Sequence, residues 1–397
     1  MAEKAEQEIA QMAESSLTDE ALREWGNRIG LSLRVSSIFN STVSFEAIRN
    51  YANGIGDSNP LYHEIEYGNG TRYGAMVASP AWLYSVFPTW VLQGLPGIHA
   101  DHSANEWQFY KPIYINDKII PECYFIGYDV KPSRFAGRTA FEYQRADYRN
   151  QHGELVASAY TMLVRYERQT AKKAGKYDAI KIPHPWTEEE LAKVDKDVLA
   201  EEVRGAKPRY WEDVNIGDEL QPVVKGPFGQ TDMVAYCIGA APVIIAAHGV
   251  QLRNYQKHPA WAFRDPVDHA WEPVYGVHYL NSAARAAGAL YAYDVGAQRQ
   301  GFLINLLTNW MGDDGWLKRN YAEYRQFFYH SDVLWLKGKV VQKYVDEDGD
   351  YCVDIETSAI NQRGADTMPG HSTVALPSRD NNIWPLDKLA RKKTRNN

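Results

Sequence analysis

Runs of β-branched and aromatic residues, separated by polar turn sequences, occupy two parts of the chain. In residues 104–168 these runs are rich in Val, Ile, Tyr and Phe, and turns such as Asn116-Asp117 and Asn150–Gly153 separate them. Residues 322–378 have the same character. Because long strands on short turns pair with their neighbours, each part predicts an antiparallel sheet.

Each of these regions follows a segment with the apolar spacing of a helix. Residues 44–56 begin with Ser44, a favourable N-cap, and residues 230–242 have Thr231 or Asp232 in the corresponding place. The turns Asn116-Asp117 and Asn150–Gly153 recur about 210 residues later, as Ser331-Asp332 and Asn361–Gly364. The order of helix and strands therefore occurs twice and predicts a duplicated fold, although few residues are identical.

This pattern, together with shifts in composition, predicts how the chain is organised. We expect five parts: an N-terminal helical extension (1–30), a first half (31–168), a linker with one helix (169–207), a second half (208–380) with an insertion (249–277), and a basic tail (381–397).

Composition narrows the classes of function. A net charge of −7 over 397 residues argues against nucleic acid as the main partner, because phosphate binding needs an excess of clustered Lys and Arg. The three cysteines are far apart and show neither metal spacing nor a disulfide framework, so we expect a cytoplasmic protein. The first residues are polar and acidic, and no apolar run is long enough for a membrane span, so no membrane partner is expected.

The densest group of chemically useful side chains follows the first helix-like segment, in the sequence GDSNPLYH. Gly56, Asp57, Asn59, Tyr62 and His63 all lie there. Asp57 and Asn59 are common turn residues before proline, because their side-chain oxygens accept bonds from the nearby backbone. A glycine-containing turn also lets a ligand approach the backbone, and a carboxylate beside an imidazole can move protons near neutral pH. The residues alone leave both interpretations open.

The sequence YANGIGDSNPLYHE resembles the hydratase motif of MaoC-like hotdog proteins, roughly Tyr-Ala followed by Gly-Asp-x-Asn-Pro-x-His. The following GTRYGAMVASPAWL is similar to the family's return into its central helix. The resemblance covers most of residues 30–168 and, with an altered motif, residues 208–378. It implies an α+β fold, a tandem (double) hotdog, in which each half has a long central helix wrapped by an antiparallel sheet.

The resemblance also implies a chemistry. Members of the family mostly add water to trans-2-enoyl-CoA thioesters, or remove it from the 3-hydroxy forms, without a metal or a redox cofactor. A carboxylate and an imidazole that touch one water can share the proton transfers. Backbone N–H groups at a helix N-terminus can stabilise the enolate charge. We therefore predict no cofactor and no metal.

Both halves depart from the family motif. The family histidine should lie five residues after the aspartate, where this chain has Tyr62, and His63 comes one residue later. Tyrosine at this place resembles the N-terminal halves of fatty-acid-synthase-type dehydratases. In the second half the aspartate is absent, but VHYLNSAARAAG resembles the sequence around the family histidine and identifies it as His278, with Asp294 nearby.

The resemblance thus assigns candidate roles. The catalytic candidates are Asp57, His63 and His278, and the substrate-binding candidates are Gly56, Asn59, Tyr62 and Asp294. The alternatives are structural: His278 can be a core histidine, Asp294 a buried and therefore paired carboxylate, and Arg299 either a CoA phosphate ligand or a salt-bridge partner.

We predict a hydro-lyase that interconverts 2-enoyl-CoA and 3-hydroxyacyl-CoA, with the Asp57 turn facing a thioester groove between the halves. A catalytically weak acyl-CoA-binding subunit and a hotdog thioesterase are the alternatives, since fold does not fix function. The Trp- and Pro-rich insertion 249–277 is expected to shape the groove for a bulky acyl chain. A homo-oligomer, for which a homodimer is the simplest form, is expected because hotdog sheets often pair.

Overall fold

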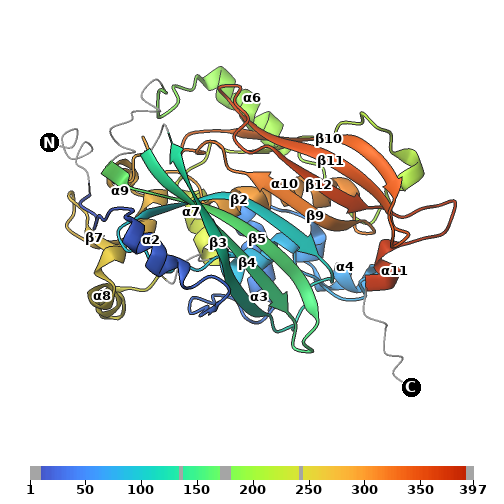
Figure 1. Cartoon of the computed structure of the whole chain (residues 1–397). Coiled ribbons are helices and arrows are strands. Elements are labelled where there is room, and N and C mark those ends of the chain that lie inside the picture. Colours follow the sequence, from blue (N-terminus) through green and yellow to red (C-terminus); the bar gives the residue numbers. More distant parts are fainter. Residues whose placement is uncertain (1–9, 134–136, 170–179, 241–244, 390–397) are drawn as a thin grey trace.

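The computed structural model describes residues 10–133, 137–169, 180–240 and 245–389. Ten strands form one antiparallel sheet, in the order β1-β3-β4-β5-β2-β9-β12-β11-β10-β6 (Figure 1). The strands are β1 (Ser32–Leu33), β2 (His99–Phe109), β3 (Ile120–Ser133), β4 (Gly137–Arg149), β5 (Leu155–Tyr166), β6 (Val223–Lys225), β9 (Trp316–Glu323), β10 (Leu334–Val345), β11 (Tyr351–Asn361) and β12 (Gly370–Ala375). The two predicted sheets are therefore halves of one sheet, joined where β2 pairs with β9.

Helices pack against this sheet, with α3, α7 and α10 near its centre (Figure 1). The α-helices are α2 (Asp19–Gly26), α3 (Phe45–Ile55), α4 (Ile65–Gly70), α6 (Glu188–Leu199), α7 (Gln230–Gly239), α8 (His248–Lys257), α9 (Asn281–Ala286), α10 (Gly296–Met311) and α11 (Pro385–Leu389). The short 3₁₀ helices are η1 (Pro60–Tyr62), η2 (Pro80–Ser85), η3 (Trp211–Asp213), η4 (Pro259–Trp261) and η5 (Val274–His278), and β7 (Ala262–Arg264) pairs with β8 (Trp271–Pro273). α2 lies in the predicted N-terminal extension and α6 in the predicted linker.

The predicted duplication is visible in the hydrogen bonds of the turns. In the first half, the Asp117 carboxylate accepts bonds from the Tyr114 backbone N–H at 3.0 Å and from the Gln151 amide at 2.9 Å. The second half repeats both bonds, to Asp332 from Tyr329 and Gln362. Because side-chain bonds of this kind fix local backbone geometry, the same short sequences build the same turn twice.

The helices α3 and α7 cross at two glycines related by the same repeat. A Cβ atom on Gly54 would lie 2.9 Å from the Cα of Tyr236, and one on Gly239 would lie 2.7 Å from the Cα of Tyr51. Real Cβ atoms do not approach backbone atoms this closely, so only glycine permits the contact. The crossing places the ends of α3 and α7 symmetrically about the centre of the molecule.

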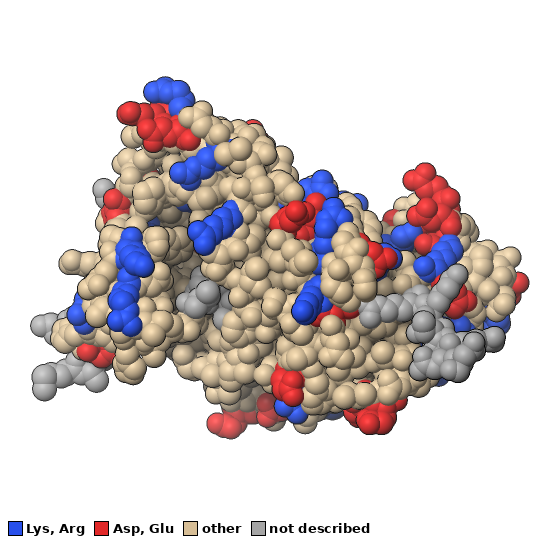
Figure 2. All heavy atoms as spheres, turned by 90° about the horizontal axis from the view of Figure 1, so that it is seen from below, with Lys and Arg blue, Asp and Glu red and all other residues tan. Residues whose placement is uncertain are grey.

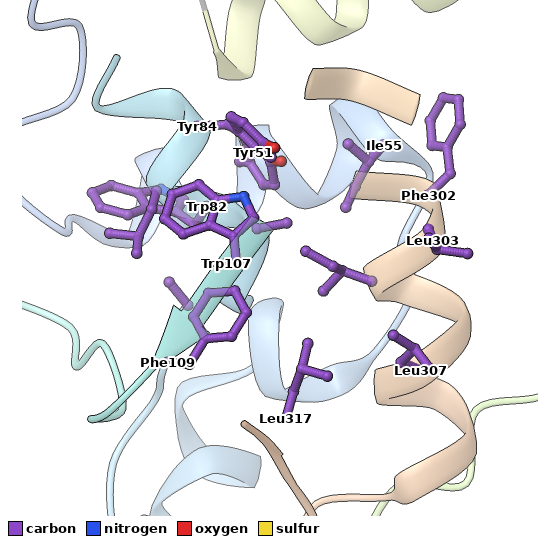
Figure 3. Close-up of a cluster of buried hydrophobic side chains, with 14 of the residues drawn as sticks. Tyr51, Ile55, Trp82, Tyr84, Trp107, Phe109, Phe302, Leu303, Leu307 and Leu317 are labelled. Atoms are coloured by element: carbon purple, nitrogen blue, oxygen red, sulfur yellow. The ribbon is translucent and has the colours of Figure 1, made fainter. Parts of the chain in front are cut away.

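One hydrophobic core fills the space between the sheet and these helices. Figure 3 shows aromatic side chains from α3, η2 and β2, including Tyr51, Trp82 and Trp107, facing the aliphatic side chains of α10. Every residue of α10 from Ala297 to Met311 is buried, so this helix is the central helix of the second half.

The corresponding segment of the first half is short. η2 spans only Pro80–Ser85, whereas α10 in the second half spans sixteen residues. Pro80 is well placed at the start of a helix, but Pro88 disfavours helical geometry for Phe87, so the helix ends early. The double hotdog with an antiparallel sheet is confirmed, while the long central helix expected in each half is present only in the second.

The face seen in Figure 2 carries Lys and Arg side chains interspersed with Asp and Glu. On this face the basic side chains do not form a continuous surface. Within the described residues, no helix has both the length and the apolar character needed to cross a bilayer.

Candidate active site

Two cavities lie at equivalent places in the two halves. The larger, here called the second-half cavity, measures about 240 Å³ and is lined by residues that include His99, Asp101, His102, His278, Tyr293, Asp294, Gly296, Ala297 and Tyr324. The smaller, here called the first-half pocket, measures about 30 Å³ and is lined by residues that include Tyr62, Tyr73, Ala78, Phe109 and Trp316.

The β-bridges establish which residues correspond. Val77 pairs with Tyr114 in the first half, and Tyr293 pairs with Tyr329 in the second. α4 and α9 precede these bridges at the same distance along the chain, and η1 and η5 end at equivalent residues. Tyr62, the last residue of η1, therefore corresponds to His278, the last residue of η5.

The two cavities differ at three equivalent positions. Tyr62 corresponds to His278. Ala78 corresponds to Asp294, because the backbone N–H of each donates to the carbonyl oxygen of the residue just before the bridge partner, Ile113 or Phe328. β2 and β9 run antiparallel with Glu106 opposite Tyr321, and the pairing is symmetric about these two residues. Asp101 and Trp316 each precede the residue at this centre by the same number of positions, so they correspond. Large rings thus close the first-half pocket, whereas ionisable groups line an open second-half cavity.

His278 enters the second-half cavity as a neutral base. Its Nδ1 atom lies 3.0 Å from the Tyr293 carbonyl oxygen, which can only accept, so Nδ1 carries the proton. Burial lowers the pKa of His278 to about 4, although the Tyr293 carbonyl and the carboxylates of Asp294 and Asp101 act in the opposite direction. At neutral pH, Nε2 is therefore an unprotonated acceptor.

Asp294 and Arg299 form a buried ion pair beside this histidine. Both guanidinium contacts to the carboxylate measure 2.8 Å, and the side chains are 0% and 3% exposed respectively. The alternative that Asp294 is a paired buried carboxylate is thus confirmed, and Arg299 is its salt-bridge partner. A bidentate pair of this kind fixes the geometry of the turn that leads into α10.

The N-terminus of α10 opens into the same cavity. Gly296 and Ala297 line it, and the first-turn N–H groups of a helix have no partner within the helix. A Cβ atom on Gly296 would lie 3.3 Å from both His102 Nδ1 and the Tyr324 ring, so a side chain there would narrow the cavity. The helix end can stabilise negative charge on a carbonyl oxygen bound nearby.

The predicted turn at Asp57 lies elsewhere, at the end of α3. Asp57 is 2% exposed, and its carboxylate accepts the Asn59 backbone N–H at 3.0 Å, while the Asn59 side chain accepts that of Leu61. Gly56 adopts the left-handed conformation that ends α3, and Lys225 donates to its carbonyl oxygen at 2.7 Å. Burial raises the pKa of Asp57 to about 7, so this carboxyl titrates near neutrality.

The structure does not pair Asp57 with either candidate histidine. His63 Nε2 lies 2.7 Å from the Asp57 backbone carbonyl oxygen, so the imidazole contacts the main chain and not the carboxylate. Tyr62 is buried in the first-half pocket. His278 lines the second-half cavity, and Asp57 does not. The candidates therefore form two separate groups, and their catalytic roles remain predictions.

Sequence reasoning missed the polar residues of β2. His99 and Asp101 both line the second-half cavity, yet the first predicted strand began at residue 104. The available signal was two ionisable residues at alternate positions, which places both on one face of a strand. An irregularity between His102 and Ala104 interrupts the pairing of β2 with β5, and His102 also lines the cavity.

A metal site has only one candidate within the described part of the chain. Asp346, Asp348 and Asp350 gather at the hairpin between β10 and β11. Lys318 contacts all three, and Lys388 lies 2.6 Å from Asp350. The two ammonium groups pair with the three carboxylates, so the cluster is best described as an ion-pair network.

A family model described as "FAS1-like, dehydratase domain region" matches residues 33–159. A UPF0336 protein of Parafrankia sp. (strain EAN1pec) is 26% identical over 131 residues, covering 31% of this chain and 82% of that protein.

Two solved structures cover most of the chain. One is a MaoC-like dehydratase, with a TM-score of 0.61 and 16% identity over 88% of this chain and 98% of that chain. The other is a conserved hypothetical protein from Mycobacterium tuberculosis described as having a double hotdog fold, with a TM-score of 0.53 and 11% identity over 88% and 96% of the two chains. The double hotdog fold and the resemblance to MaoC-like dehydratases, with a fatty-acid-synthase-type first half, are confirmed, and hydratase or dehydratase chemistry is supported as a class.

Proposed function

We propose that this protein interconverts 2-enoyl-CoA and 3-hydroxyacyl-CoA thioesters in the second-half cavity. The observation that supports the proposal is the meeting of a neutral imidazole, His278, with the N-terminus of α10 in one enclosed space. The first-half pocket, at about 30 Å³ against about 240 Å³, offers an acyl group far less space.

The helix N-terminus, the imidazole and the apolar lining each have a role in the proposed reaction. The thioester carbonyl lies at the N-terminus of α10, where backbone N–H groups stabilise the enolate that forms when water attacks the β carbon. Nε2 of His278 accepts the proton of that water. Apolar and aromatic lining residues such as Val277 and Phe327 hold the acyl group and exclude bulk water.

The two alternatives make different predictions about products. A binding subunit holds acyl-CoA without exchanging water, and the absence of an aspartate from the second-half motif motivates it. A thioesterase releases free CoA. A hydratase differs from both, because it changes the mass of the thioester by one water and leaves CoA attached.

The test measures the gain of water by mass spectrometry on crotonyl-CoA, trans-2-decenoyl-CoA and cinnamoyl-CoA. The wild type is expected to hydrate at least one of them, and His278→Ala to lose about 10²–10⁴-fold in kcat. His152→Ala changes an exposed turn histidine far from either cavity lining and serves as the matched control. Release of free CoA, or binding without hydration, would replace the proposal with the corresponding alternative.

The insertion is proposed to set the acyl preference. Trp261 and Val274 line both the second-half cavity and a neighbouring space of about 220 Å³, so removing the indole joins the two. Trp261→Ala is expected to shift the preference from crotonyl-CoA towards decenoyl-CoA or cinnamoyl-CoA. An unchanged ratio of kcat/KM values across the three substrates would exclude this role. Self-association remains a prediction, which light scattering of the purified chain tests.

A further inference from the structure

The second-half sequence motif lacks the aspartate of the first half. IGAAPV stands where the first half has IGDSNP. Hydration by His278 alone leaves one group to bind the water, remove its proton and deliver that proton to carbon. A second polar group that orients the water would divide these tasks.

Two carboxylates line the second-half cavity, and they differ in exposure and in partner. The side chain of Asp294 is 0% exposed and forms a bidentate ion pair with Arg299. The side chain of Asp101 is 24% exposed and faces the same cavity from β2, a strand of the first half. Asp101 is also near enough to His278 for its charge to raise the pKa of that imidazole.

Asp101 is held in place by a chain of side chains. The Tyr166 hydroxyl donates to one of its oxygens at 2.8 Å, and His99 Nε2 lies 3.1 Å from the other. Arg168 donates to His99 Nδ1 at 3.2 Å, which leaves Nε2 as the protonated nitrogen that donates to Asp101. Burial acts to raise the pKa of Asp101, but the charge and hydrogen bonds of its neighbours prevail and the pKa is lowered. The group is therefore an oriented, ionised carboxylate at neutral pH.

We propose that Asp101, contributed by the first half, takes the place of the carboxylate that the second-half motif lacks and orients the reacting water against His278. This inference rests on the function proposed above. It makes the active site a joint product of both halves, with the imidazole and the helix N-terminus from one and the carboxylate from the other. The equivalent residue in the lining of the first-half pocket, Trp316 of β9, offers no such group.

The proposed addition of water conserves protons and electron pairs. One O–H proton of the water moves to Nε2 of His278 as the water oxygen bonds to the β carbon, and the alkene electrons move onto the thioester oxygen as an enolate. The imidazolium then returns that proton to the α carbon, and the enolate collapses to the thioester. Asp101 accepts a hydrogen bond from the water, and its negative charge balances the imidazolium.

The experiment compares Asp101→Asn with wild type and with Asp147→Asn, using crotonyl-CoA and the active substrate of the wild type. Asp147 is a buried carboxylate on β4 that bonds Ser158 and Arg145 and lines neither active-site cavity, so its variant controls for loss of a buried charge. Asp101→Asn is expected to lower kcat by about 10²–10⁴-fold, with KM within about threefold of wild type. A kcat within about threefold of wild type would overturn the inference.

Two further readouts separate chemistry from structure. Asp101→Glu restores a carboxylate and is expected to recover at least about tenfold over Asp101→Asn; equal impairment of the two variants would contradict a role for the charge. Binding of butyryl-CoA, which cannot be hydrated, is expected to be unchanged in Asp101→Asn by calorimetry, and its loss would indicate a structural role instead. If wild type hydrates no substrate, the proposed function fails; if wild type is active and Asp101→Asn equals it, only this inference fails.

Discussion

At the scale of single residues, the two halves are distinguished by what stands at equivalent positions. Tyr62 and His278 end equivalent short helices, but one is a buried ring that fills a pocket and the other is a base that lines a cavity. The surroundings of His278 add to this difference between the two residues. The Tyr293 carbonyl fixes the tautomer of His278, and burial keeps its imidazole neutral. The difference between the two cavities therefore depends on a few substitutions within a repeated backbone.

The low pKa of His278 predicts the pH dependence of activity. Nε2 can accept a proton only while the imidazole is neutral, so kcat/KM is expected to be constant above about pH 6 and to fall as the pH decreases towards 4. The ionisable groups that face the imidazole are Asp101, Asp294, His99 and Tyr293. The measurement is a kcat/KM profile with enzyme stability checked at each pH. An acid limb centred near 6.5, the ordinary value for histidine, would contradict the assignment.

Asp57 predicts a pH dependence of stability. Its pKa is about 7 in the folded protein and about 3.8 when unfolded, so between these values the folded state binds the extra proton. The free energy of unfolding should therefore decrease as the pH rises from about 4 to 7. Asp57→Asn removes this contribution, and at pH 8 it is expected to be more stable than wild type by on the order of a few kcal/mol.

Urea unfolding of wild type and Asp57→Asn at pH 5 and pH 8 measures this effect. The difference between the two proteins should grow with pH, whichever other groups titrate, because those groups are common to both. A difference that is the same at both pH values would show that Asp57 is already ionised at pH 5.

Candidate site residues could be selected from the sequence where they lie in a local motif. They could not be selected where folding brings together residues that are far apart in the chain. His278 was selected as a candidate from the sequence around it, and it lines the second-half cavity. The pairing of Asp294 followed from the cost of an unpaired buried charge. Asp101 was missed because its neighbours come from β5 and from the other half of the chain. The adjacency of Asp57 and His63 suggested a pair, but the short loop directs the imidazole to a carbonyl oxygen.

At the scale of elements, the turns were the most predictable parts. Asn150 and Asn361 each accept two backbone N–H groups within their own turn, so a few residues determine the geometry. The central helices were less predictable. Whether a segment continues as α10 or ends early as η2 depends on proline positions and on burial around the whole segment.

The crossing of α3 and α7 gives a prediction for an element contact. Gly239→Ala would place a Cβ atom 2.5 Å from the Asn50 carbonyl oxygen, so the helices must separate. We expect it to lower the free energy of unfolding by about 1–3 kcal/mol, the usual cost of overpacking. Gly70→Ala, at the end of α4 with no atom within 4 Å of the added Cβ, is the matched control. Equal stability of the two variants in urea would contradict the close crossing.

At the scale of the whole molecule, the two repeats form one continuous structure. β2 and β9 pair along the middle of the sheet, and each cavity is lined by both halves. Duplication could be predicted from the order of helix and strands, and the double hotdog from the resemblance to MaoC-like proteins. Which cavity is open could not, because that depends on Trp316 and Asp101 occupying corresponding places on strands far apart in sequence.

The unequal cavities predict one ligand per chain. Native mass spectrometry with butyryl-CoA is expected to show a single bound molecule, because, of the two equivalent cavities, the second-half cavity measures about 240 Å³ and the first-half pocket only about 30 Å³. Asp101→Trp copies the residue that closes the first-half pocket and is expected to abolish binding, since an indole would occupy the space in front of His278. Asp101→Asn, which keeps the volume, is the control and should still bind one. Two ligands on wild type, or undiminished binding by Asp101→Trp, would show that the acyl group enters elsewhere.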